Sequence, residues 1–161
     1  MSVKITGVAE VKRQFAAIED FLKSTKPMEG IVADIKDIVL DKTSKGHDYM
    51  GRNFKPYTKA YAERRKKLGL STRPDLTVSG TMLGALKTEV KDPRHGAVFV
   101  GSEAEPKGRA KSDMLAQIHT TGTGKQPQRE FLNLAPTAVK KLTKKHYDDP
   151  ILKLVKEARG R

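Results

Sequence analysis

The sequence predicts an α+β fold in which N-terminal helices pack on a small, mainly antiparallel sheet, with short inserted helices and a basic helical tail at the C-terminus. Three observations support it. Apolar residues recur every three or four positions from Val8 to Leu22, which is typical of a helix with one apolar side. After Leu86 the apolar pattern alternates, which is typical of a strand. Lysine-rich segments follow Pro136. We therefore expect a core domain over residues 1–134 and a tail over residues 135–161.

The N-terminal part of the chain predicts one short strand and two helices. Residues 2–6 alternate and Gly7 ends that strand. The stripe of the first helix consists of Val8, Val11, Phe15, Ile18 and Leu22. Pro27 and Glu29 suit the first turn of the second helix, because proline is tolerated there and a carboxylate complements the helix dipole. The apolar side of that second helix consists of Ile31, Ile35, Ile38 and Val39. We expect both stripes to be buried, against each other or against the sheet.

The first of three short motifs, Gly51-Arg-Asn-Phe-Lys-Pro-Tyr57, closes a loop over residues 45–56. Phe54 is expected to fill the edge of the core, and Pro56 to fix the direction of the chain. Thr58 would then cap a helix over residues 59–68, which Gly69 would end in a left-handed conformation. This helix carries four consecutive basic residues, Arg64, Arg65, Lys66 and Lys67. Since their side chains point to several sides of the helix, they cannot all face the core, and the helix should lie at the surface or in an interface. The alternative is a surface helix that contacts only solvent.

The second motif, Leu76-Thr-Val-Ser-Gly-Thr-Met-Leu83, contributes Leu76, Gly80 and Leu83 as structural anchors. Ser79 is expected to cap a short helix. Alternation over residues 86–91, a turn over residues 92–95 and a return over residues 97–101 predict an antiparallel hairpin. Residues 103–112 contain proline, glycine and many charges, which predicts a mobile loop.

The third motif is Ala116-Gln-Ile-His-Thr-Thr-Gly122, followed by Pro127-Gln-Arg-Glu-Phe-Leu132. Ile118 should fill the core and Gly122 should end a helix by adopting a positive φ. Residues 129–132 predict the last strand, with Phe131 and Leu132 as anchors. Arg129 would pair with a carboxylate of a neighbouring subunit, and an ordinary loop and strand without an interface is the alternative.

The tail predicts two helices. The first starts near Pro136 and has Val139 and Leu142 on its apolar side, and Asp149 followed by Pro150 predicts the start of a separate second helix. The opposite side of the first helix carries candidate contacts to DNA or to an acidic partner, Lys140, Lys141, Lys144 and Lys145.

The positive charge lies in one part of the chain. Residues 1–51 contain eight basic and eight acidic residues, so the whole excess of +13 lies in residues 52–161. This favours a polyanionic neighbour, such as DNA or an acidic protein ring, over charge that serves solubility alone. An apolar content of 37% is low for a compact domain, so we expect neighbouring molecules to stabilise part of the fold.

Catalytic patterns are incomplete in this sequence. Because there is no cysteine, disulfides, zinc-thiolate sites and thiol nucleophiles are excluded. Gly124-Lys125 looks like the end of a phosphate-binding loop, but His119 and Gln126 stand where that loop needs glycine and a hydroxyl residue. The four histidines are far apart, although Asp48 beside His47 leaves chance metal coordination open. We expect no enzyme activity, no cofactor and no metal. Neither a signal peptide nor a membrane span is evident, so we expect cytoplasmic assembly without membrane contact.

In their order and spacing the three motifs resemble those of virion-morphogenesis or tail-completion proteins of tailed bacteriophages. The resemblance extends from about Val3 to about Leu142, with Phe54 where the family usually has tryptophan. It implies a virion protein of the neck or tail end that forms a ring, expected to be sixfold, and joins tail to head. Its partners would be further copies, other neck, portal-side or tail-tube proteins, and phosphates of the genome DNA. The alternative is a small basic protein that binds nucleic acid without reading its sequence.

Overall fold

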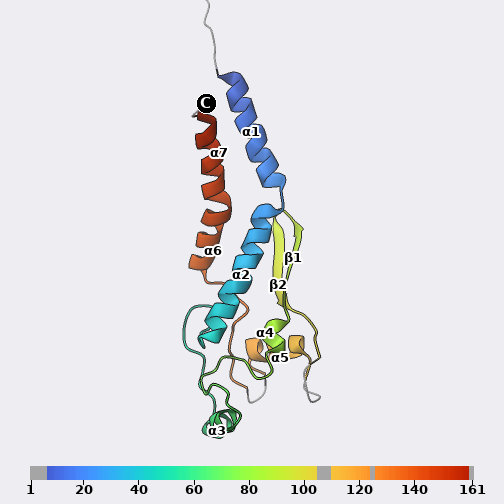
Figure 1. Cartoon of the computed structure of the whole chain (residues 1–161), viewed down its shortest axis with the longest axis vertical. Helices are drawn as coiled ribbons and strands as arrows, with labels where there is room; N and C mark the ends of the chain where they lie inside the picture. The colour runs from blue at the N-terminus through green and yellow to red at the C-terminus, as the bar shows by residue number, and fades with distance from the viewer. Residues whose placement is uncertain (1–6, 105–109, 124–125, 160–161) are drawn as a thin grey trace, which may run out of the picture.

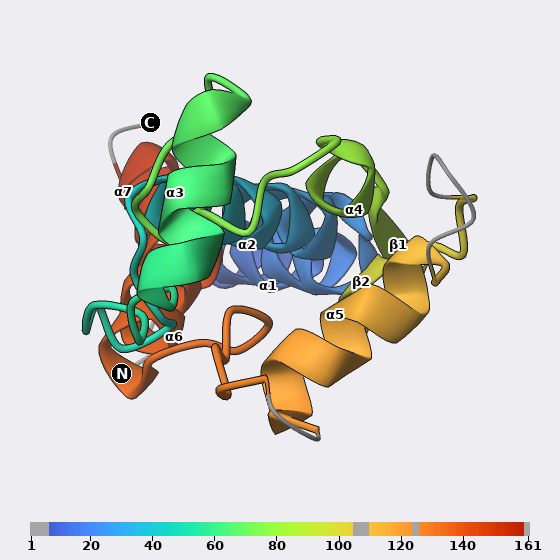
Figure 2. The same ribbon diagram turned by 90° about the horizontal axis from the view of Figure 1, so that it is seen from below.

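The computed structural model describes residues 7–104, 110–123 and 126–159, and it confirms the predicted α+β class. The elements are α1 (Val8–Lys23), α2 (Lys26–Ser44), α3 (Lys59–Lys67), α4 (Thr81–Gly84), β1 (Leu86–Asp92), β2 (His95–Val100), α5 (Ser112–Thr121), α6 (Pro136–Thr143), the π-helical turn η2 (Lys144–Asp148) and α7 (Asp149–Arg159). The molecule is elongated, with α1 and α7 at one end and α3, α4 and α5 at the other (Figure 1). Seen from that second end, α3, α4 and α5 lie around the end of α2 (Figure 2).

The sheet is the predicted hairpin. Strands β1 and β2 pair antiparallel, with Leu86 opposite Val100 and Asp92 opposite His95. Within the described residues this hairpin is the whole sheet, and α2 packs along it. The two approach closely at Gly96, where a Cβ atom would lie 2.6 Å from a methyl group of Val32. Helix α2 therefore covers the hairpin as expected, and a side chain at this glycine would push the two apart.

The hydrophobic core lies where α2, the hairpin and the three motifs meet. Its buried members are Val39, Phe54, Leu76, Met82, Ala85, Leu86, Val100, Ala116 and Phe131. Leu83 and Leu132 pack against this cluster from its edge. Each motif thus contributes at least one side chain to a single core.

Residues 129–132 do not form the predicted last strand. The Arg129 amide donates to the His119 carbonyl, at 2.7 Å, whereas the Glu130 carbonyl accepts from the Tyr49 amide, at 3.1 Å. Because these backbone bonds go to two separate segments, no ladder forms, although the Phe131 side chain still enters the core. The strand predicted over residues 2–6 lies outside the described residues.

The tail is one continuous helical segment, so the predicted break at Asp149 and Pro150 is wrong. Asp149 has helical dihedral angles, with φ −64° and ψ −45°, and its carboxylate pairs with Lys144. Proline removes an amide donor and crowds the preceding helical turn. The wider π turn η2 directly before Pro150 accommodates this without ending the helix.

The tail packs on the core through η2. His146 Nε2 lies 2.7 Å from an Asp34 carboxylate oxygen, and the Tyr147 hydroxyl donates to the Pro93 carbonyl at 2.8 Å. At Gly30 of α2, a Cβ atom would lie 2.5 Å from the His146 ring. The middle of the tail is therefore joined to α2 and to the hairpin turn.

Helix α1 contradicts the expectation that its apolar stripe is core. It contains no buried residue, and it packs on α7 and not on the sheet. Phe21 contacts the Tyr147 ring edge-to-face, with 6.3 Å between centroids. The exposed members of the stripe are Val8, Val11, Phe15 and Leu22. The amphipathic pattern is present, but among the described residues nothing covers most of it.

Candidate functional site

The three motifs meet around one pocket of about 610 Å³, which lies between α3, α4 and α5. The first motif lines it with Pro56 and Tyr57, the second with Leu76, Val78, Ser79, Gly80 and Met82, and the third with Ile118, His119, Pro127 and Arg129. Its wall is mostly apolar, with hydroxyl, imidazole and guanidinium groups between the apolar side chains. The sequence predicts separate roles for these residues and does not predict the pocket. Tyr57 and Pro127, which lie near the predicted anchors of the first and third motifs, could have indicated a shared apolar surface.

Tyr57 organises one wall of the pocket. The guanidinium carbons of Arg65 and Arg129 lie 4.8 Å and 5.0 Å from the centroid of its ring, and Tyr61 contacts it edge-to-face at 4.9 Å. Such cations over an aromatic face are attracted by its quadrupole. Burial raises the pKa of the Tyr57 phenol, so the ring carries its proton at neutral pH. This wall is therefore a packed stack of cations and rings.

Arg129 is a buried structural residue and not the exposed interface residue that we expected. Its Nε and Nη2 both donate to the Lys55 carbonyl, at 3.2 Å and 3.0 Å. These bonds tie the third motif to the first. Gly122 ends α5 at φ 73°, as predicted, and a Cβ atom there would lie 2.8 Å from the Gln128 amide nitrogen. The return of the chain toward Arg129 therefore depends on glycine at this position.

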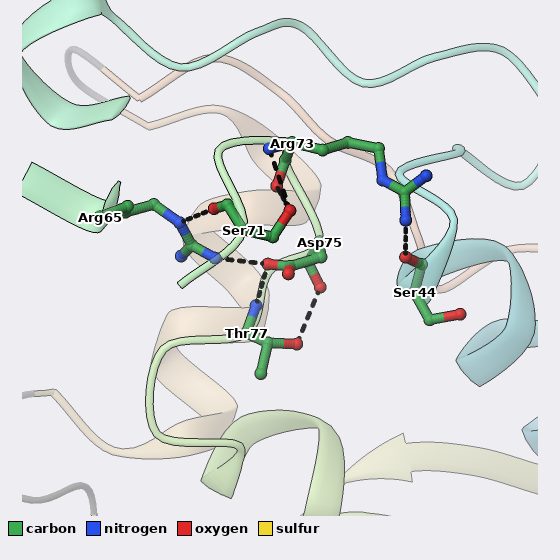
Figure 3. A network of polar contacts seen from close by, with 6 residues as sticks. All are labelled: Ser44, Arg65, Ser71, Arg73, Asp75 and Thr77. Carbon is green, nitrogen blue, oxygen red and sulfur yellow. Dashed lines mark hydrogen bonds and ion pairs between the residues drawn. The ribbon is translucent and has the colours of Figure 1, made fainter. Parts of the chain in front are cut away.

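Arg65 is also buried, in contrast to its three basic neighbours on α3. Its Nε donates to the Ser71 carbonyl at 2.6 Å, and its Nη2 donates to Asp75 at 2.8 Å (Figure 3). The same carboxylate oxygen accepts from the Thr77 amide at 2.9 Å. This network holds the loop that carries Leu76, which has an unusual positive φ of 56° for a residue with a side chain. The second motif thus depends on one residue of the basic helix.

His119 is a neutral imidazole in the pocket wall. Burial, with a smaller effect of the Arg129 charge, lowers the pKa of His119 from its usual 6.5 to about 4. Its Nδ1 is buried and has no hydrogen-bond partner within the part of the chain that the structure describes. The group is therefore suited to accept or donate a hydrogen bond as a neutral ring, and not to hold a charge.

The protein should lose stability through His119 as the pH falls from about 6.5 to about 4. The unfolded chain binds a proton with a pKa of 6.5, whereas the folded protein resists protonation until about pH 4. The free energy of unfolding that neutral His119 supports is fully present above pH 6.5 and decreases as the pH falls. The total decrease should be on the order of 2 kcal/mol after allowance for partial exposure. Urea unfolding at pH 7 and pH 4.5 measures it.

The variant His119→Gln should lose less stability than the parent between the two pH values, because it has no imidazole at this buried position to bind a proton. Asp34 and other carboxylates whose pKa is lowered from 3.8 act below this range. Equal losses in His119→Gln and in the parent would contradict the prediction.

The remaining predicted contact residues fall into two groups. The exposed ones without an ion pair in the described part of the chain are Arg64, Lys66, Lys67, Lys140 and Lys141. Lys144 pairs with Asp149, and Lys145 lies 2.6 Å from an Asp34 carboxylate oxygen. The four tail lysines are therefore not equivalent, because Lys145 joins the tail to α2 and Lys144 pairs within the tail.

The polar residues considered for chemistry have structural contacts. Asp48 accepts from the amides of Met50 and Arg52, each at 2.9 Å, and from Arg52 Nε at 2.8 Å. Burial alone would raise the pKa of Asp48, but these hydrogen bonds lower it. The Ser79 hydroxyl accepts from the Thr81 amide at 3.3 Å, at the start of α4. In the described ranges no group of three histidine or acidic side chains is placed to hold a metal ion. Gly124 and Lys125 lie outside those ranges.

Hydrogen bonds join the two ends of the predicted loop over residues 103–112. The Ser112 hydroxyl donates to the Gly101 carbonyl at 2.5 Å and accepts from the Glu103 amide at 2.7 Å. Residues 105–109 lie outside the described residues, so the predicted mobility is not tested.

Comparison of the chain with family models, curated proteins and solved structures found no match. Among the helices of the described residues, none has the length and apolar character to cross a membrane. The functional interpretation therefore depends on the motifs and on the geometry of the pocket, the basic helices and α1.

Proposed function

We propose that the protein is a structural subunit of the neck or tail end of a tailed-bacteriophage virion, where copies form a ring that joins tail to head. The observation that carries this proposal is the convergence of the three motifs. They are separated in sequence, yet they supply one core and line one pocket. A resemblance based on such motifs concerns one folded unit, and not three unrelated short matches.

The composition of the pocket favours assembly over bond-breaking chemistry. His119 is neutral, Arg129 is engaged in structural hydrogen bonds, and Ser79 contacts the start of α4. An apolar pocket with a few polar groups is suited to receive a side chain or segment of a neighbouring protein. In this proposal the pocket is a contact between proteins of the neck.

The basic residues would bind a polyanionic neighbour. Exposed candidates are present on α3 and on α6, at Lys66, Lys67, Lys140 and Lys141. If they face the channel, they would neutralise phosphates of the genome without reading its bases. If they face along the axis, they would dock on acidic protein rings. Arg65 and Arg129 are not assigned to this role, since both are buried.

A charge-reversal variant of α6 tests the proposal. We expect Lys140→Glu with Lys141→Glu to leave thermal unfolding nearly unchanged and to lower the yield of joined, infectious particles by about tenfold or more. The reason is that a contact worth about 0.5 kcal/mol is lost in each of several ring subunits. Complementation of a phage that lacks the gene, with electron microscopy of heads and tails, measures the yield.

The matched control is Arg13→Glu with Lys26→Glu, which changes the net charge equally on two exposed residues of the N-terminal part, whose net charge is zero. It should assemble like the parent. Variants at Lys144 and Lys145 are avoided, because they would also remove the ion pairs with Asp149 and Asp34. Parental infectivity of the Lys140/Lys141 variant would show that this surface serves solubility alone. A protein that binds DNA strongly by itself but is absent from particles would favour the nucleic-acid-binding alternative.

A further inference from the structure

Helix α1 carries a regular apolar seam that stays open in the part of the chain that the structure describes. The seam residues Val8, Val11, Phe15, Ile18 and Leu22 are spaced by three, four, three and four positions. This is the spacing of the a and d positions of a coiled coil through two heptads. Four of the five remain between 46% and 68% exposed, with Phe15 the most exposed. The pattern is therefore that of a helix made to pack on another helix along this side.

Helix α7 covers only one flank of the seam. The partly buried residues of α1 are Gln14, Ile18 and Phe21, which are four and three residues apart and share one side of the helix. Helix α1 packs on α7, and the two ribbons lie side by side in Figure 1, so we infer that this partly buried side faces α7. The exposed seam residues lie beside that contact, so the pair forms a two-helix arm with one open apolar side.

The charges beside the seam indicate what occupies it. If Val8 is an a position, Lys12 and Glu19 are both e positions, on the flank away from Gln14 and Phe21. In an antiparallel pair of identical helices, the e positions face each other. Lys12 of one copy would then meet Glu19 of the other, and the symmetry would make this contact twice. The spacing of the seam residues is also nearly symmetric about Phe15, with apolar residues seven and four positions before it and three and seven positions after it. An antiparallel partner therefore meets nearly the same seam.

We propose that α1 binds α1 of a second copy of this chain in antiparallel orientation, so that two arms form a four-helix bundle with both α7 helices. The net charge of α1 supports this partner, because its three basic and three acidic residues cancel in a protein of charge +13. The basic helix α3 lies at the opposite end of the molecule (Figure 1). Pairing through the arms therefore brings two α1 helices of zero net charge together and keeps the two α3 helices apart.

Other occupants fit α1 less well. A membrane-surface helix gains much of its affinity from lysine and arginine on its polar side, and the equal numbers of acidic and basic residues in α1 remove that attraction. DNA would bind to the basic helices in preference to α1, for the same electrostatic reason. A twofold contact closes on itself, so this surface alone makes a dimer and not a ring. The inference is thus independent of the proposed neck function.

Light scattering with size-exclusion chromatography of the full chain tests the pairing. The parent should show a concentration-dependent mass near twice its 17.8 kDa, and Phe15→Glu should remain at the single-chain mass. Lys12→Glu or Glu19→Lys alone should raise the dissociation constant about tenfold, since each places like charges together twice per dimer. The double variant should return to within about twofold of the parent.

The rescue by the double variant reports a contact between copies. Lys12 and Glu19 are seven residues apart, or about 10 Å along one helix, so they do not pair within a chain. Glu19 contacts Lys23 within the chain, and the double variant does not restore that contact. Arg13→Glu is the matched control: it changes the same charge away from the seam and should dimerise like the parent.

Three results would overturn the proposal. One is a parent that stays at the single-chain mass at concentrations of about 100 μM. Another is a dimer that Phe15→Glu leaves intact. The third is a monomer that binds phosphatidylcholine and phosphatidylglycerol vesicles and loses this binding in Phe15→Glu, which would assign the seam to a lipid surface.

Discussion

Phe131→Ala should lower the free energy of unfolding by about 3–5 kcal/mol, because it removes a ring from a closely packed site. The side chain is 2% exposed and belongs to the cluster that joins α2, the hairpin and the motifs. Its segment forms no strand, so no sheet ladder supports it beyond the single backbone bonds of Arg129 and Glu130. Urea unfolding followed by circular dichroism at pH 7 measures the change.

Phe99→Ala is the control for this prediction, because that ring is 41% exposed on the hairpin. It should cost less than about 1 kcal/mol, as is usual for surface substitutions. Phe54→Ala should resemble Phe131→Ala, since Phe54 is buried in the same cluster. If the two buried rings and the exposed ring gave equal small losses, the core would not depend on the motifs.

The ends of several helices and the hairpin turn could be predicted from the sequence, because they depend on residues close together in the chain. Thr58 caps α3 by accepting from the Tyr61 amide, and Gly69 follows that helix at φ 67°. Pro136 starts α6, and the turn between Asp92 and His95 closes the hairpin. In each case a few neighbouring residues determine the backbone conformation, so no knowledge of distant contacts was needed.

Tertiary partners could not be predicted in the same way. The periodicity of α1 establishes an apolar side, but it does not tell whether this side meets the sheet, α7 or another molecule. Residues 129–132 were predicted to be a strand, yet pairing requires a free strand edge beside them, and the segment bonds to two separate partners. The pocket was missed for the same reason, because its wall combines residues from three distant segments.

Arg65 is the clearest case of a residue whose role the sequence misassigned. Four consecutive basic residues indicated a surface helix, and the other three are indeed exposed. Arg65 points inward because Asp75 and the Ser71 carbonyl accept its hydrogen bonds and Tyr57 packs on its guanidinium. Those partners come from outside the helix, so helical periodicity could not reveal them.

Asp75→Ala should therefore lower the free energy of unfolding by about 3–5 kcal/mol. The substitution leaves the Arg65 guanidinium, which is 1% exposed, without the carboxylate beside it, and breaking a buried pair on one side costs about this much. It also removes the acceptor of the Thr77 amide, which supports the positive φ of Leu76. Urea unfolding at pH 7 measures the loss.

The control is Asp41→Ala, which breaks an ion pair with Lys45 whose two side chains are more than half exposed. Its loss should be less than about 1 kcal/mol, because water screens such a pair. Adding Arg65→Met to Asp75→Ala should recover part of the stability, since no unpaired charge then remains buried. Such a recovery would identify desolvation of the guanidinium as the cause of the stability loss in Asp75→Ala. If the double variant instead lost as much stability as the two single variants together, the cause would be the loop around Leu76. If Asp75→Ala and Asp41→Ala were equally mild, the network would not support the second motif.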